Sequence, residues 1–143
     1  MAQLLLSQND IPRLTALSGN IDIDKLTPFV FQAQILDGKR ILGTDLFNKI
    51  LTDFTNDNLS GDYATIYNDY LIFIIAYYAS SYYVKLDAYQ INNNGGKKSN
   101  DSENYRQLGI TFETQLLEFL KENDVAEYVK ENATTVKAIK PWY

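Results

Sequence analysis

The order of apolar and polar residues predicts helices along almost the whole chain. The clearest pattern covers residues 105–120, where apolar residues recur at three- and four-residue spacing, the period of one helical face. We expect a helix that starts near Asp101 or Ser102 and ends at Asn123-Asp124. Its inner face would consist of Tyr105, Leu108, Phe112, Leu116 and Phe119, widened by Leu117 and Leu120.

Three further helices are expected in the first third of the chain. A short one is capped by Ser7 or Asp10 and ends at Gly19-Asn20. The next begins at Asp24, or at Thr27 with Pro28 in the first turn, and stops at Gly43. Thr44 would cap the third. The apolar face of the second helix would consist of Leu26, Phe29, Val30, Ala33 and Leu36. The apolar face of the third would consist of Leu46, Phe47, Ile50, Leu51 and Phe54.

The centre of the predicted fold is one long helix over residues 62–91, which contains no proline or glycine. Residues 70–79 are apolar on every side, so other elements must surround this part. Eight of the eleven tyrosines lie in this helix. Tyrosine suits a helix that neighbours cover only in part, so these rings either pack in the core with their hydroxyls at the surface or form a subunit interface.

The rest of the pattern consists of loops, a short helix and a tail. Residues 92–102 read as a solvated loop between two helices. A short last helix would hold Val125, Tyr128 and Val129. The fold expected is therefore all-α, a single-domain bundle of five or six helices over residues 1–136 with an extended tail, residues 137–143.

Composition removes several classes of function. The chain of 143 residues has no cysteine and no histidine, which excludes disulfides, thiolate metal sites, imidazole bases and Ser-His-Asp triads. The net charge is −5, and no basic stripe is present to neutralise phosphates. The longest uncharged stretch, residues 70–84, is shorter than the roughly 20 apolar residues of a membrane span. The N-terminus lacks the basic start of a signal peptide.

The remaining candidates for chemistry are carboxylates, lysines and tyrosines. Asp22 and Asp24 stand at a helix start, where capping explains them. Glu113 and Glu118 do not share a helical face well, and Glu127 and Glu131 would lie on a solvated face. We therefore expect no enzyme activity, no cofactor and no metal site.

Several short segments in the first third of the chain form a recognisable series. They are Leu5-Leu6-Ser7 through Asp10-Ile11, Asn20-Ile21-Asp22, Leu26-Thr27-Pro28, Ala33-Gln34 and Ile41-Leu42-Gly43 followed by Leu46-Phe47. With them, residues 4–51 resemble the start of the small adaptor proteins of head–tail connectors in tailed phages, including crAss-like and other Bacteroidetes phages. The long tyrosine-rich helix, polar loop and following helix agree with that family in architecture only.

The resemblance implies a virion structural protein at the head–tail junction, made in the cytoplasm of the host bacterium. Such subunits form a ring, usually of twelve copies, beneath the portal protein. The ring extends the DNA channel and presents a surface to further connector or tail proteins. The acidic composition agrees with DNA that slides past without specific binding. The alternative is a monomeric helical adaptor or inhibitor that binds one protein.

The C-terminal tail is the expected partner-binding site. Pro141 prevents a helix from continuing, so Trp142 and Tyr143 would project from an extended segment. Trp and Tyr are frequent interface anchors, and Lys137 and Lys140 could meet an acidic neighbour. Docking on a neighbouring subunit or on the portal competes with packing on the tail's own domain and with disorder.

Overall fold

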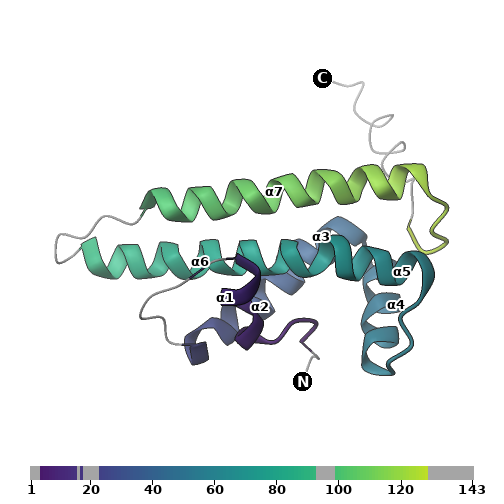
Figure 1. Cartoon of the computed structure of the whole chain (residues 1–143), viewed down its shortest axis with the longest axis horizontal. Helices are drawn as coiled ribbons and strands as arrows, with labels where there is room; N and C mark the ends of the chain where they lie inside the picture. The colour runs from purple at the N-terminus through teal and green to yellow at the C-terminus, as the bar shows by residue number, and fades with distance from the viewer. Residues whose placement is uncertain (1–3, 16, 18–22, 93–98, 129–143) are drawn as a thin grey trace, which may run out of the picture.

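The computed structural model describes residues 4–15, 17, 23–92 and 99–128. Two long helical stretches dominate it (Figure 1). The first is a continuous helical run from Gly61 to Asn92, which comprises α5 (Gly61–Thr65), the π-helical segment η4 (Ile66–Leu71) and α6 (Ile72–Asn92). The second, α7 (Ser99–Glu122), runs antiparallel beside α6 and η4. The prediction of a long central helix is confirmed.

Most of the short helical elements form a layer on the side of α6 away from α7, whereas α3 (Lys39–Leu42) lies behind α6 (Figure 1). In chain order they are the 3₁₀ turn η1 (Gln8–Asp10), α1 (Ile11–Thr15), the 3₁₀ turn η2 (Ile23–Leu26), α2 (Thr27–Ala33), the π-helical segment η3 (Gln34–Gly38), α3 (Lys39–Leu42) and α4 (Thr44–Thr55). Helices α1 and α2 pack directly on α6, and α4 packs on α3. Every regular element in the described ranges is helical, which confirms the all-α class.

Helix α6 is the core of the domain. Ile74, Ile75, Ala76 and Ala79 are completely buried, because the N-terminal layer covers one side of the helix and α7 the other. The apolar stretch 70–79 predicts burial on every face, and the structure differs on one: Tyr70, Phe73 and Tyr77 remain half-buried because no element covers that face completely. Ser80 and Ser81 are also buried, and the hydroxyl of Ser81 donates to the carbonyl oxygen of Ser102 at 2.9 Å. That bond attaches the middle of α6 to the first turn of α7.

The starts of three elements test the predicted caps. The Ser7 hydroxyl accepts a hydrogen bond from the Asn9 amide at 3.2 Å, so this cap is confirmed. The predicted Thr44 cap is wrong: Thr44 is the first residue of α4, and Gly43 holds the cap position. Gly43 has a φ of 83°, a conformation that glycine adopts without strain, and it both ends α3 and starts α4. Likewise Thr27 is the first residue of α2 and Leu26 holds its cap position.

The predicted inner face of α7 is correct in its centre and wrong at its margins. Leu116 and Leu120 are fully buried, but Leu108 and Leu117 are 42% and 38% exposed. A single helix, α6, covers α7 over a narrow sector, and these two leucines flank that sector on opposite sides. Gly109 is buried in place of Leu108, and it packs closely on the ring of Tyr78.

The segment after α7 is not the short helix that the pattern predicts. Residues 123–128 form turns, in which Val125 is buried and Tyr128 packs on the core. The side-chain amide of Asn123 donates to the carbonyl oxygen of Phe119 at 2.8 Å, at the C-terminal end of α7. Helix α7 itself begins at Ser99, slightly before the predicted start. Gly19-Asn20, residues 93–98, Val129 and the tail lie outside the described residues.

Candidate functional site

The predicted partner-binding residues Lys137, Lys140, Pro141, Trp142 and Tyr143 lie outside the described residues, as do Asp22 and Glu131. Glu113 and Glu118 do not share a face, as the spacing predicts: Glu113 is largely buried and Glu118 is exposed. Among the described residues, two polar arrangements and one aromatic surface are candidate functional sites. The first arrangement and the aromatic surface involve the helical pair α6–α7, whereas the second arrangement joins α5 to the turn after α7.

The first arrangement, the Arg40 network, consists of Asp37, Arg40, Tyr78, Tyr82 and Glu113. The guanidinium of Arg40 donates to both carboxylate oxygens of Glu113 at 3.0 Å and to Asp37 Oδ1 at 3.1 Å. Each carboxylate also accepts a tyrosine hydroxyl: Tyr78 donates to Glu113 at 2.7 Å and Tyr82 to Asp37 at 2.6 Å. The network joins η3 and α3 to α6 and α7.

Charge compensation in the network shifts its pKa values away from neutrality. Burial alone would raise the pKa of Glu113, but hydrogen bonds from Arg40 and Tyr78 outweigh it and hold the pKa below 4.5. Burial, followed by the hydrogen bonds to Glu113 and Asp37, raises the pKa of both Tyr78 and Tyr82 above 10. The hydrogen bond to Glu113 raises the pKa of Arg40. A general acid or base works best with a pKa near the operating pH, so the network favours a structural role.

Two features of the sequence indicate this network, although the spacing of apolar residues alone does not show it. Asp37 and Arg40 are three residues apart, a spacing that pairs side chains on a helix. Glu113 follows Phe112 and precedes Leu116 on the buried side of α7. A carboxylate at a buried helical position needs a cationic or hydroxyl partner. Which partner it finds depends on the packing of the two segments.

The second arrangement is the pair Tyr63–Glu127. The Tyr63 hydroxyl donates to Glu127 Oε1 at 2.6 Å, and this hydrogen bond raises the Tyr63 pKa to about 12. The ammonium of Lys49 lies 4.9 Å from the centre of the Tyr63 ring. Glu127 thus has a definite partner instead of lying on the solvated helical face that the sequence predicts.

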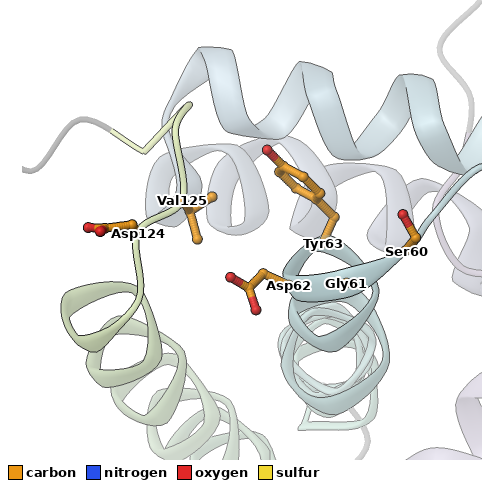
Figure 2. Close-up of a pocket in the computed structure, with 6 residues that line it drawn as sticks. All are labelled: Ser60, Gly61, Asp62, Tyr63, Asp124 and Val125. Atoms are coloured by element: carbon orange, nitrogen blue, oxygen red, sulfur yellow. The ribbon is translucent and has the colours of Figure 1, made fainter.

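Two shallow cavities flank this pair. One, of about 220 Å³, is lined by Ser60, Gly61, Asp62, Tyr63, Asp124 and Val125 (Figure 2). Asp62 projects into the space between α5 and the turn after α7, whereas the Asp124 carboxylate points away from Tyr63. The other, of about 340 Å³, is lined by residues 40–45, Glu127 and Tyr128. Small ligands usually occupy enclosed apolar pockets with a few convergent polar groups, and neither cavity has that form.

The aromatic surface lies along one edge of the α6–α7 pair. We name it the aromatic strip, and it comprises Tyr70, Phe73, Tyr77, Tyr105, Phe112 and Phe119, all half-buried. Phe73 stacks on Phe112 with ring centres 4.9 Å apart, and Tyr77 stacks on Phe112 at 5.8 Å and on Tyr105 at 6.4 Å. Tyr70 and Phe119 extend the strip, at 5.7 Å. The tyrosine-rich helix thus contributes to the core and also leaves a broad aromatic surface partly open.

The aromatic strip and the Arg40 network occupy opposite edges of the helical pair. On α6, Phe73 and Tyr78 are five positions apart, which separates them by about 140° around the helix. On α7, the neighbours Phe112 and Glu113 diverge by about 100°. One edge is therefore aromatic and the other is charged.

The described part of the chain contains neither a metal-binding group nor a membrane-spanning helix. No group of acidic side chains there is arranged to hold a metal ion. None of its helices combines the length and the apolarity that crossing a membrane requires.

Comparison with known proteins adds one relationship. No curated protein and no solved structure matches the chain. A family model, described as a family of unknown function (DUF6712), matches residues 39–138. The match includes α4 to α7, Arg40, Glu113, Glu127 and the whole aromatic strip, and covers more than half of the sequence. The chain therefore belongs to the DUF6712 family.

Proposed function

We propose that this protein is a virion structural protein, a subunit of the head–tail connector ring of a tailed phage. In this role it sits below the portal protein, extends the DNA channel and joins the portal to the tail. The resemblance implies twelve copies. The proposal combines the resemblance of residues 4–51 with one observation from the fold.

That observation is the difference between the two edges of the α6–α7 pair. A closed ring of identical subunits uses head-to-tail contacts, in which one surface of each copy meets a different surface of the next. The half-buried aromatic strip lies on one edge of the pair of helices, and the half-exposed Arg40 of the network lies on the other, so the two edges are unlike. A two-fold dimer would need only one self-complementary patch. The presence of two unlike edges therefore favours a closed ring over a two-fold dimer.

The segments that carry the resemblance lie together in the structure, apart from Asn20-Ile21-Asp22, which is outside the described residues. The side-chain oxygen of Gln34, in the Ala33-Gln34 motif, accepts a hydrogen bond from the Leu5 amide at 2.7 Å. Gln34 and Leu5 are both completely buried. Leu26, Leu42 and Leu46, from the other matching segments, belong to the same core. The resemblance thus concerns one packed unit, which gives it more weight than scattered helix caps would have.

The exposed face of α7 suits a channel through which DNA passes without binding. Between Arg106 and Lys121 this helix has no basic residue. The exposed positions there include Gln107, Thr111, Thr114, Gln115 and Glu118. Phosphate binding depends on lysine and arginine, so we expect no binding of the isolated protein to duplex DNA at micromolar concentration and physiological salt. Tight binding would contradict a passive channel.

The decisive experiment is identification of the protein in purified phage particles, followed by reconstruction of the head–tail junction. We expect a closed ring of this chain between portal and tail. Absence from the particle, or presence as an isolated monomer, would refute the proposal. A monomeric adaptor or inhibitor would instead be recovered from infected cells in complex with one protein and without particles.

A further inference from the structure

We propose that the aromatic strip is the docking site for residues 137–143 of a neighbouring copy of this chain. The inference rests on the proposed function, because it names the contact that would join successive subunits of the ring. It rests on two observations: the partial exposure of the strip, and the composition and charge of the C-terminal segment.

The strip is a surface that intramolecular packing leaves incomplete. Four of its rings stack across α6 and α7, Tyr70 and Phe119 form a tilted pair beside them, and all six remain partly exposed. Leu108 lies beside it on α7 and is 42% exposed. A contiguous apolar surface of this kind on a folded domain marks an interaction site, whereas scattered single apolar residues do not.

The C-terminal segment has the composition to cover such a surface. Its sequence, VKAIKPWY from Val136, combines aliphatic residues with Trp142 and Tyr143, the residue types most enriched in interface centres. Pro141 favours an extended backbone, which can lie along a groove between two helices. Ring stacking on Phe73 or Phe112 would bury the indole of Trp142.

Charge is complementary as well. Asp69 precedes Phe73 by one helical turn, and Glu122 follows Phe119 by about one turn; both are exposed. Lys137 and Lys140 in the C-terminal segment carry the opposite charge. Pairs of this kind at the rim of an interface fix the orientation of the bound segment more than they add to its affinity.

The proposed ring supplies the C-terminal segment from a neighbouring copy. Tyr128 lines the cavity formed with residues 40–45, so the described chain ends on the side of Arg40, whereas the strip is on the opposite edge. Residues 129–136 can span at most about 28 Å when fully extended, so the segment after them can reach an adjacent surface. In a head-to-tail ring each copy would extend its C-terminal segment from the edge that holds Arg40 onto the strip of the next copy.

Cross-linking between two different variants tests this directly, because the natural chain has no cysteine. Full-length Leu108→Cys is mixed with full-length Tyr143→Cys and treated with a short bis-maleimide, in concentrated solution and in assembled particles. Leu117→Cys is the matched control, since it is similarly exposed on the other side of α7. We expect mixed dimers several-fold more often from position 108. Equal yields from both positions would overturn the proposal.

A chain that carries both Leu108→Cys and Tyr143→Cys distinguishes the source of the segment. Cross-links within one chain, in place of links between chains, would mean that the segment covers its own strip and would also overturn the proposal. Trp142 provides a second measurement, since it is the only tryptophan in the chain. Its emission should shift to the blue on assembly, and Phe73→Ser should reverse the shift whereas Leu117→Ser should not. Emission typical of solvent in the assembled state would contradict docking.

The outcomes separate this inference from the function on which it rests. A ring in the phage particle without links from position 108 would reject the docking site and leave the connector role intact. Links from position 108 in a protein absent from particles would reject the connector role and retain the contact between copies.

Discussion

Arg40 and Glu113, 73 positions apart in the chain, face each other through two parallel hydrogen bonds of 3.0 Å. The fork of the guanidinium matches both carboxylate oxygens, the geometry in which an Arg–carboxylate pair is strongest. This pair joins the N-terminal layer to α7 across one edge of α6. It also holds the Tyr78 and Tyr82 hydroxyls in place through the shared carboxylates.

Loss of this pair should destabilise the domain measurably. Arg40→Ala leaves Glu113, which is 18% exposed, without its cation. Because Arg40 itself is half exposed, the loss should be about 1–2 kcal/mol in the free energy of unfolding, between the values for surface and buried pairs. Urea denaturation measures it. The control is Arg106→Ala, whose pair with Glu103 is exposed on both sides and should contribute at most about 0.5 kcal/mol. Equal effects would mean that the Arg40 network is unimportant for stability.

Acid should weaken the domain through Glu113. Its folded-state pKa lies below the ordinary 4.5, so the stabilisation is complete above that pH and is lost as the pH falls through the folded-state value. Glu113→Gln should remove this component and flatten the decline of unfolding free energy below pH 4.5. Denaturation curves over a series of acid pH values provide the comparison. An unchanged slope in the variant would assign the acid response to other carboxylates.

Strong alkali should weaken the domain through Tyr63. Its pKa rises from 10.0 in the unfolded chain to about 12 in the fold, so the hydroxyl stabilises the fold fully below pH 10 and progressively less up to about 12. Tyr63→Phe should reduce the alkaline loss of stability. Glu127→Gln retains an acceptor without the charge, and tyrosinate absorbance should then show ionisation at lower pH. An identical tyrosinate titration in the natural protein and in Glu127→Gln would contradict the assigned hydrogen bond.

Gly109→Ala should destabilise the domain although alanine favours helices. The added methyl group would lie 3.2 Å from the ring of Tyr78, which is buried and held by Glu113 and so cannot move freely. The strain should exceed the helix-propensity gain of about 1 kcal/mol and leave a net loss of similar size. Gly38→Ala is the control, since its nearest side-chain atom would be at 3.5 Å. Thermal unfolding of both variants should show a loss only for Gly109→Ala.

A charge in the middle of α6 should prevent folding. Ile75 is completely buried among apolar residues, and an unpaired carboxylate in such a place costs several kcal/mol. Ile75→Asp should therefore lose its cooperative thermal transition by circular dichroism. Leu86→Asp, on the same helix but 46% exposed, should retain it. A folded Ile75→Asp protein would show that α6 is not the core.

The sequence by itself determined the helices and the position of the core. Periodicity, glycine breaks and the absence of proline act over a few residues, so the stretch ending at Gly43, the helix after it, the run 61–92 and α7 can be read locally. The apolar stretch 70–79 likewise identifies the buried helix, since a helix that is apolar on all sides must be covered.

Only the tertiary structure decided which polar groups meet and which apolar groups stay open. Glu113 acquires its partner from residue 40, and Tyr67 donates to the carbonyl oxygen of Leu5, 62 positions away, so no local pattern contains these pairs. Leu108 is exposed and Gly109 buried because the sector that α6 covers is narrower than the apolar face of α7. The aromatic strip arises in the same way, where the half-covered rings of two helices align along one edge.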